Sequence, residues 1–111
     1  MSLPAPTIEA LGDELFAALR ARTVLDPLTT RHPAIAIEDA YQVSLRFLER
    51  RQAQGEKIIG KKIGVTSKPV QDMLGVHQPD FGFLLDTMKV PDGTAVSLSK
   101  AKLIQIGRAH V

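Results

Sequence analysis

Lys62 has the surroundings in this sequence that most strongly suggest chemistry. It stands in the run KIIGKKIGVT, residues 57–66, with Gly60 two residues before it and Gly64 two residues after it. In a β-strand these three residues share one face, so the lysine stem would lie in a trough without flanking side chains. A partly desolvated lysine can transfer a proton or hold an anionic substrate. Alternatively, Lys61 and Lys62 are solvent-facing residues of an edge strand, where lysine prevents aggregation.

A second group of candidate residues lies in the segment HQPDFG, residues 77–82. Its proline is expected to stiffen a loop between two apolar elements, and loops on a scaffold often carry function. Asp80 is a candidate general base or a partner for Lys62, although its side chain could equally cap the local turn. His77 is one of three scattered histidines that lack the spacing of a metal site.

Several other kinds of site are disfavoured. Residues 55–61 match the Gly-x-x-x-x-Gly-Lys part of a phosphate-binding loop, but Lys62 stands where Ser or Thr should follow. The expected helix also precedes this segment instead of following it. The sequence has no cysteine, which excludes disulfides, thiolate zinc sites and cysteine nucleophiles. No Glu-x-Glu or similar carboxylate pair is present to hold a divalent ion.

Composition places the chain among globular proteins of one domain. It has 111 residues, of which 44% are hydrophobic and 23% charged. The net charge is only +2 and aromatic residues make up 5%, so the sequence lacks the basic, aromatic surface of a nucleic-acid binder. No stretch approaches the roughly 20 apolar residues of a membrane span, and the start does not resemble a signal peptide. We expect a cytoplasmic protein that binds neither nucleic acid nor membrane.

Helices in the first half and strands in the second are expected to position the candidate residues. The helices are predicted over residues 8–22, 37–54 and 68–74, and the strands over residues 57–66, 83–85 and 94–98. Thr7 and Ser67 are candidate N-caps, and Gly12 weakens the first helix. The inward-facing residues are predicted to be Ala40, Tyr41, Ser44, Phe47 and Leu48 on the second helix and Val70, Met73 and Leu74 on the third. This order of elements predicts an α+β fold.

The two motif segments together resemble a known enzyme family. GKKIGVTSK at residues 60–68 and VQDMLGVHQPDFG at residues 70–82 resemble the 2-oxopent-4-enoate (2-keto-4-pentenoate) hydratases of aromatic meta-cleavage pathways, in the fumarylacetoacetate hydrolase superfamily. The segments DELF at 13–16 and DAYQ at 39–42 fit the same family. The resemblance implies a lyase that adds water to 2-hydroxypenta-2,4-dienoate, giving 4-hydroxy-2-oxopentanoate. It also implies that Mg²⁺ or Mn²⁺ chelates this small 2-oxo or 2-hydroxydienoic acid substrate.

The resemblance assigns roles by motif position. It implies that Lys62 and Asp80 are catalytic, and it makes Gly60, Gly64 and Gln78 candidate substrate-binding residues. The fold it implies is α+β, with N-terminal helices followed by the first strands of a mixed β-roll.

The sequence departs from the family pattern after residues 103–105. In the family, Leu-Ile-Gln is followed by a segment whose glutamates ligate the metal, whereas here IGRAHV follows. The resemblance therefore implies a truncated chain without metal ligands, in which residues 1–105 are the N-terminal portion of a hydratase-like domain and residues 106–111 an extraneous tail. Such a fragment is expected to be inactive, and the full-length enzyme to form a homo-oligomer.

Two alternatives to the hydratase remain open. The related 4-oxalocrotonate (2-oxo-3-hexenedioate) decarboxylases share the scaffold and the metal but release CO₂. A small non-enzymatic binding or assembly module would also agree with the short chain and the missing ligands.

Overall fold

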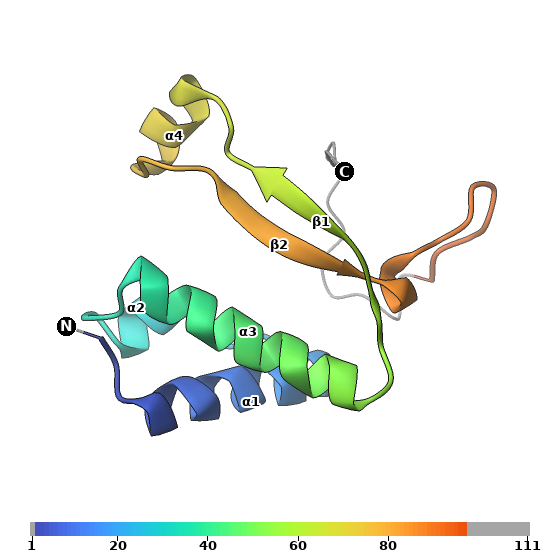
Figure 1. The fold of residues 1–111 in the computed structure, drawn as a ribbon, viewed down its shortest axis with the longest axis horizontal. Helices are drawn as coiled ribbons and strands as arrows, with labels where there is room; N and C mark the ends of the chain where they lie inside the picture. Colours follow the sequence, from blue (N-terminus) through green and yellow to red (C-terminus); the bar gives the residue numbers. More distant parts are fainter. Residues whose placement is uncertain (1, 98–111) are drawn as a thin grey trace. The chain divides into compact units, whose positions relative to one another are not determined.

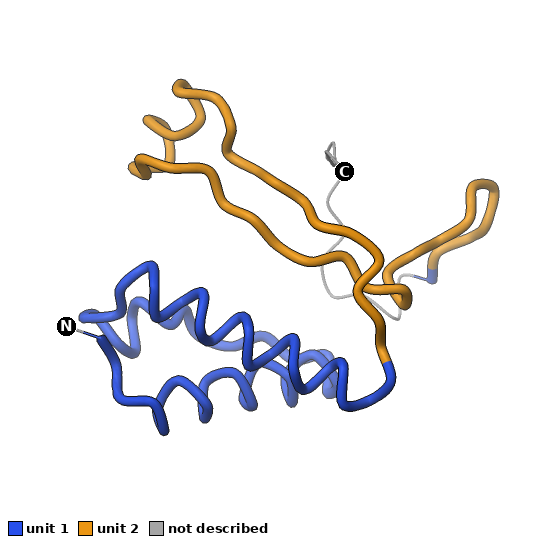
Figure 2. Tube along the Cα trace, in the orientation of Figure 1, with its two compact units in different colours: residues 1–55, 97–102 blue, residues 56–96, 103–111 orange. Residues whose placement is uncertain are grey.

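The computed structural model describes residues 2–97, which divide into two compact units. The helical unit covers residues 2–55, and the ribbon unit, which contains the β-strands, covers residues 56–96 (Figure 2). Helices combined with an antiparallel sheet confirm the α+β class. Among residues 2–97, no helix has both the length and the apolar composition needed to cross a bilayer. The expected tail at 106–111 lies outside the described residues.

The helical unit is built on two long helices that lie side by side (Figure 1). Helix α1 covers Ala5–Ala21 and helix α3 covers Ile37–Ala53, and both were predicted from the apolar spacing. Helix α1 begins before the predicted Thr7 cap because a proline in its first turn loses no hydrogen bond there. The segment between the first two predicted helices was expected to be a loop from residue 23 to residue 33, but it contains one short helix, α2, at Leu28–Arg31.

The core of the helical unit lies between α1 and α3. Its buried apolar side chains are Leu11, Phe16, Val43 and Leu48. The predicted inner face of α3 was wrong at Ala40 and Ser44, which are exposed, whereas Asp39 and Val43 are buried. The Asp39 carboxylate accepts hydrogen bonds from the backbone N–H groups of Leu3, at 3.1 Å, and Ala36, at 3.0 Å. Because its oxygens are satisfied, this carboxylate can be buried where an apolar residue was expected.

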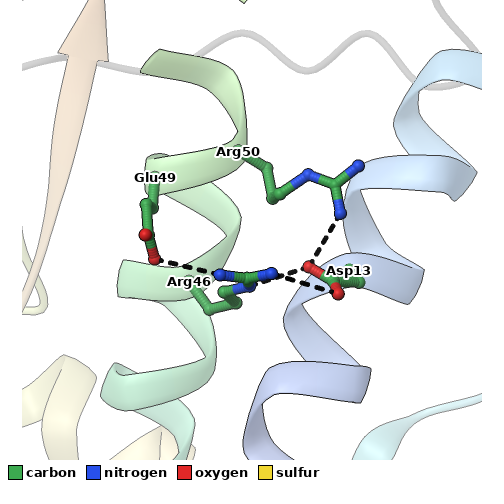
Figure 3. A network of polar contacts seen from close by, with 4 residues as sticks. All are labelled: Asp13, Arg46, Glu49 and Arg50. Atoms are coloured by element: carbon green, nitrogen blue, oxygen red, sulfur yellow. Dashed lines mark hydrogen bonds and ion pairs between the residues drawn. The ribbon is translucent and has the colours of Figure 1, made fainter. Parts of the chain in front are cut away.

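Gly12 allows α1 and α3 to approach closely. A Cβ atom at this position would lie 2.4 Å from Cγ and 2.5 Å from Cβ of Arg46 on α3. The neighbouring Asp13 accepts hydrogen bonds from Arg46 Nε at 2.8 Å and Nη2 at 3.3 Å, and its Oδ1 lies 3.1 Å from Arg50 Nη1 (Figure 3). Gly12 weakens α1 as an isolated helix, but it makes room for Arg46, the residue of α3 that binds Asp13 of α1.

The ribbon unit is an antiparallel pair of strands with a short helix in the connection. Strand β1 covers Ile58–Gly64, helix α4 covers Lys68–Leu74 and strand β2 covers Asp80–Leu85, followed by one turn of 3₁₀ helix at Asp86–Met88. The strand predicted over 57–66 and the helix predicted over 68–74 are confirmed. The Ser67 hydroxyl caps α4 by accepting a hydrogen bond from the Val70 N–H at 3.4 Å.

Two strand predictions were wrong. Strand β2 begins at Asp80 and not at residue 83, so Asp80 belongs to the ladder and not to a loop. Pro79 has no N–H to donate, and pairing therefore starts at the residue after it. Residues 94–97 form no strand, and residue 98 lies outside the described part of the chain. A turn precedes them, in which the Thr94 N–H donates to the Pro91 carbonyl at 3.1 Å.

The apolar side chains of α4 do not face a core. Val70, Met73 and Leu74 are all exposed, which contradicts the prediction that they point inward. The described ribbon unit has no second layer against which this helix could bury them. Capping and periodicity set the helix, but burial also requires a partner surface.

Candidate active site

Lys62 lies in the middle of β1, directly opposite Gly82 on β2. A Cβ atom on Gly82 would lie 3.8 Å from Cγ of Lys62, so the lysine stem passes over this glycine. Gly60 and Gly64 are the next residues on the same face of β1. Lys62 is therefore surrounded by three glycines on this face, namely Gly60 and Gly64 on its own strand and Gly82 on the partner strand. Sequence reasoning missed Gly82 because its place depends on how the strands pair.

Asp80 is directly opposite Gly64, one step along the same face of the ribbon. The position that a Cβ atom of Gly64 would occupy lies 2.6 Å from Asp80 Oδ1 and 3.8 Å from Lys62 Nζ. The carboxylate and the ammonium group thus lie on the same face of the ribbon, each close to the position of the missing Gly64 side chain. The structure brings together the two residues predicted to be catalytic, although they are far apart in the sequence.

Gln78 does not join this group. It lies with His77 in the segment between α4 and β2, and both side chains are exposed. Within residues 2–97, no hydrogen bond connects Gln78 to Lys62 or Asp80. Its suggested part in substrate binding therefore has no contact in the structure to support it.

The end of β1 carries backbone strain that the sequence did not reveal. Val65 adopts the left-handed conformation, with φ of 54°, which is rare for a β-branched residue. The Gln71 side-chain N–H donates to the Val65 carbonyl at 2.9 Å and so ties α4 to this turn. Strained residues cluster at functional sites, and this one follows Gly64 directly.

The two adjacent lysines of β1 face opposite sides of the ribbon. Lys61 is opposite Phe83, and its Nζ lies 5.9 Å from the centroid of that ring. Lys62 faces Gly82 and the carboxylate of Asp80 instead. A neighbouring cation and anion on one face can hold an anionic substrate and exchange protons with it.

The described residues do not form a metal site. Within residues 2–97, no three side chains of His, Cys, Asp or Glu converge as metal ligands. The charged groups that the described residues bring to this face are therefore the Lys62 ammonium and the Asp80 carboxylate.

Comparison with known proteins shows that this chain is similar in sequence to part of two hydratases. Over 98 residues the chain is 62% identical to a 2-hydroxyhexa-2,4-dienoate hydratase of Comamonas testosteroni and 60% identical to a 2-hydroxypent-2,4-dienoate hydratase of Pseudomonas putida. Both alignments cover 88% of this chain, but only 37% and 44% of the respective hydratases. The chain thus spans less than half the length of these relatives.

The fold also matches a solved structure. A 4-oxalocrotonate decarboxylase from Pseudomonas putida G7, complexed with magnesium and adipate, superposes with a TM-score of 0.84 and 34% identity. The match covers 89% of this chain and 38% of the decarboxylase. A search against protein-family models found no match.

Proposed function

We propose that this chain, which is related to the 2-hydroxydienoate hydratases over 98 of its residues, supplies the acid–base pair of a hydratase active site. The reaction is the addition of water to a short 2-hydroxy-2,4-dienoate, with 4-hydroxy-2-oxopentanoate as the product from the five-carbon substrate. The observation that carries the proposal is that Lys62 Nζ and Asp80 Oδ1 lie on one face of the ribbon, both within 4 Å of the position that a Gly64 Cβ atom would occupy.

The reaction needs groups that move protons in both directions. As the dienol becomes a ketone, its 2-hydroxyl group loses a proton and a carbon of the diene gains one. Water then adds to C4 of the resulting enone and loses a proton, and C3 gains a proton as the ketone is restored. We assign proton acceptance to the Asp80 carboxylate, and we assign proton donation, or attraction of the anionic substrate, to the Lys62 ammonium.

The metal implied by the family does not fit the residues of this chain that the structure describes. They offer no convergent set of carboxylate or imidazole ligands. We therefore assign any metal ligands to parts of the longer enzymes beyond the matched region, and the roles of Lys62 and Asp80 above use no metal.

The same proposal extends to the architecture. We interpret β1 and β2 as the first strands of the mixed β-roll of the fumarylacetoacetate hydrolase type. Residues 1–105 would form the N-terminal portion of a hydratase-like domain, and residues 106–111 an extraneous tail. The complete enzyme would be a cytoplasmic homo-oligomer.

A hybrid enzyme tests the proposal directly. The 98 matched residues of this chain would replace the aligned residues of the Pseudomonas putida 2-hydroxypent-2,4-dienoate hydratase, and turnover of 2-hydroxypenta-2,4-dienoate would be measured. Lys62→Ala should lower kcat at least about a hundredfold, as loss of a general acid or base does. The 111-residue chain by itself should show no turnover.

Lys61→Ala is the matched control for this experiment. It removes the adjacent lysine, which faces the other side of the ribbon beside Phe83. The hybrid with this substitution should keep kcat within a few-fold of the unmodified hybrid. Equal losses for the two lysines, or full activity of Lys62→Ala, would contradict the assigned role.

The related decarboxylase is the second candidate, because its solved structure superposes closely on this chain. In a second hybrid, the matched residues of this chain would replace the aligned part of the Pseudomonas putida decarboxylase. This hybrid would be assayed with 4-oxalocrotonate. Activity in this hybrid alone would favour decarboxylation. Two folded but inactive hybrids would favour a non-enzymatic module.

A further inference from the structure

We propose that Gly64 is a positioning residue, whose missing side chain leaves room for the Asp80 carboxylate on the face of the ribbon that also carries Lys62. The effect of this positioning role on catalysis rests on the proposed function. The placement of the two charged groups can be tested without measuring enzyme activity.

The space above Gly64 is already occupied. A Cβ atom on this residue would lie 2.6 Å from Oδ1 and 3.7 Å from Cγ of Asp80. Cβ atoms in proteins essentially never approach another heavy atom within 3.0 Å. Any other residue at position 64 must therefore displace the Asp80 carboxylate from its present place on the face shared with Lys62.

The displacement should spare the fold. The atom in conflict is the end of the Asp80 side chain and not the backbone, so rotation of that side chain relieves it. Gly64 also lies outside the left-handed region, so alanine can adopt its backbone conformation. Gly64→Ala is thus expected to keep the pairing of β1 with β2 while moving the carboxylate.

Gly82 provides the matched control. It lies on the same face of the ribbon, opposite Lys62, and its backbone is also outside the left-handed region. A Cβ atom there would lie 3.8 Å from Lys62 Cγ, which is ordinary van der Waals contact. Gly82→Ala therefore adds the same methyl group to the site without displacing either charged group.

Cross-linking with a water-soluble carbodiimide measures the placement in the full 111-residue chain. The reagent activates a carboxylate, which a nearby lysine amine attacks to form an amide bond as the reagent leaves as a urea. The yield of the Lys62–Asp80 cross-link would be measured by peptide mass spectrometry. The ion pair of Lys68 and Asp72 on α4 gives an internal reference that the substitutions do not touch.

Gly64→Ala should lower the Lys62–Asp80 yield, relative to the reference, by about tenfold or more, because small displacements of reacting groups cost large factors in rate. Gly82→Ala should leave the ratio close to that of the unmodified chain. In the hybrid hydratase, Gly64→Ala should lower kcat far more than it changes KM.

An unchanged cross-link ratio in Gly64→Ala would overturn the inference. So would loss of the β1–β2 ladder in this variant, seen in the amide chemical shifts, because the glycine would then be required by the backbone and not by the carboxylate. Inactive hybrids together with the expected cross-links would reject the proposed function and leave the positioning role standing.

Discussion

The helical unit and the ribbon unit differ in how completely they bury their own apolar side chains. Leu11 and Val43 of the helical unit are 3% and 1% exposed, whereas Ile63 and Phe81 of the ribbon remain 51% and 52% exposed although they face each other across the strands. Two amphipathic helices can cover each other, but a two-stranded ribbon has no second layer. Four of the five buried apolar side chains among the described residues thus belong to the helical unit, and the fifth, Leu85, belongs to the ribbon.

The candidate catalytic pair lies in the less buried unit. Lys62 and Asp80 are placed by the register of two strands and by glycines, without a core around them. An isolated ribbon is marginally stable in water, so its site depends on whatever covers the ribbon. The comparison predicts that mutations in the helical unit affect stability, and that mutations in the ribbon affect the site.

The largest expected effect comes from the core of the helical unit. Phe16→Ala removes a buried ring and should lower the free energy of unfolding by about 3 kcal/mol, read from chemical denaturation followed by helical circular dichroism. The matched substitution in the ribbon, Phe81→Ala, removes an exposed ring and should change the same transition little. Equal losses of unfolding free energy in the two variants would show that the two units share a core, and would contradict the difference between them described above.

Gly12→Ala sharpens the comparison within the helical unit. Helix propensity alone would make this change stabilising by about 1 kcal/mol. The new methyl group, however, would overlap Cβ and Cγ of Arg46, and overpacking costs about 1–3 kcal/mol. We expect a lower unfolding midpoint, measured by thermal denaturation.

Ala10 provides the control for this substitution. It is exposed on the same helix, so Ala10→Gly should show the propensity cost alone, about 1 kcal/mol. A more stable Gly12→Ala variant would show that the helices can separate at this point without loss.

The smallest expected effect is the response of the helical unit to acid. Hydrogen bonds and charges from Arg46 and Arg50 hold the pKa of Asp13 below its ordinary value of 3.8, and Arg31 holds the pKa of Glu14 below 4.5. The unfolded chain therefore takes up these protons at higher pH than the native one. The stabilisation is complete above the ordinary values and is lost as pH falls through the lowered ones.

The thermal midpoint of the helical transition should accordingly fall as the pH is lowered from about 5 to about 2. The effect should be modest and weaker at high salt, since these pairs are partly exposed. Asp13→Asn combined with Glu14→Gln should flatten the pH dependence. An equally steep dependence in the double variant would assign it to other groups.

Sequence reasoning succeeded where a feature depends on neighbouring residues. The Ser67 cap of α4 and the strand with Lys62 between two glycines both follow from local patterns. It failed for the inner face of α3, where Asp39 took an apolar position because backbone N–H groups of Leu3 and Ala36 satisfy its carboxylate. Those donors come together only in the folded chain.

The sequence by itself thus determined the two long helices, helix α4, the first strand and the face on which Lys62 lies, because backbone preferences and periodicity act over a few residues. Only the tertiary structure decided that Gly82 lies opposite Lys62 and that Asp80 lies opposite Gly64. Strand register is set by hydrogen bonds between residues distant in the chain, and a shift of one residue would turn Asp80 to the other face.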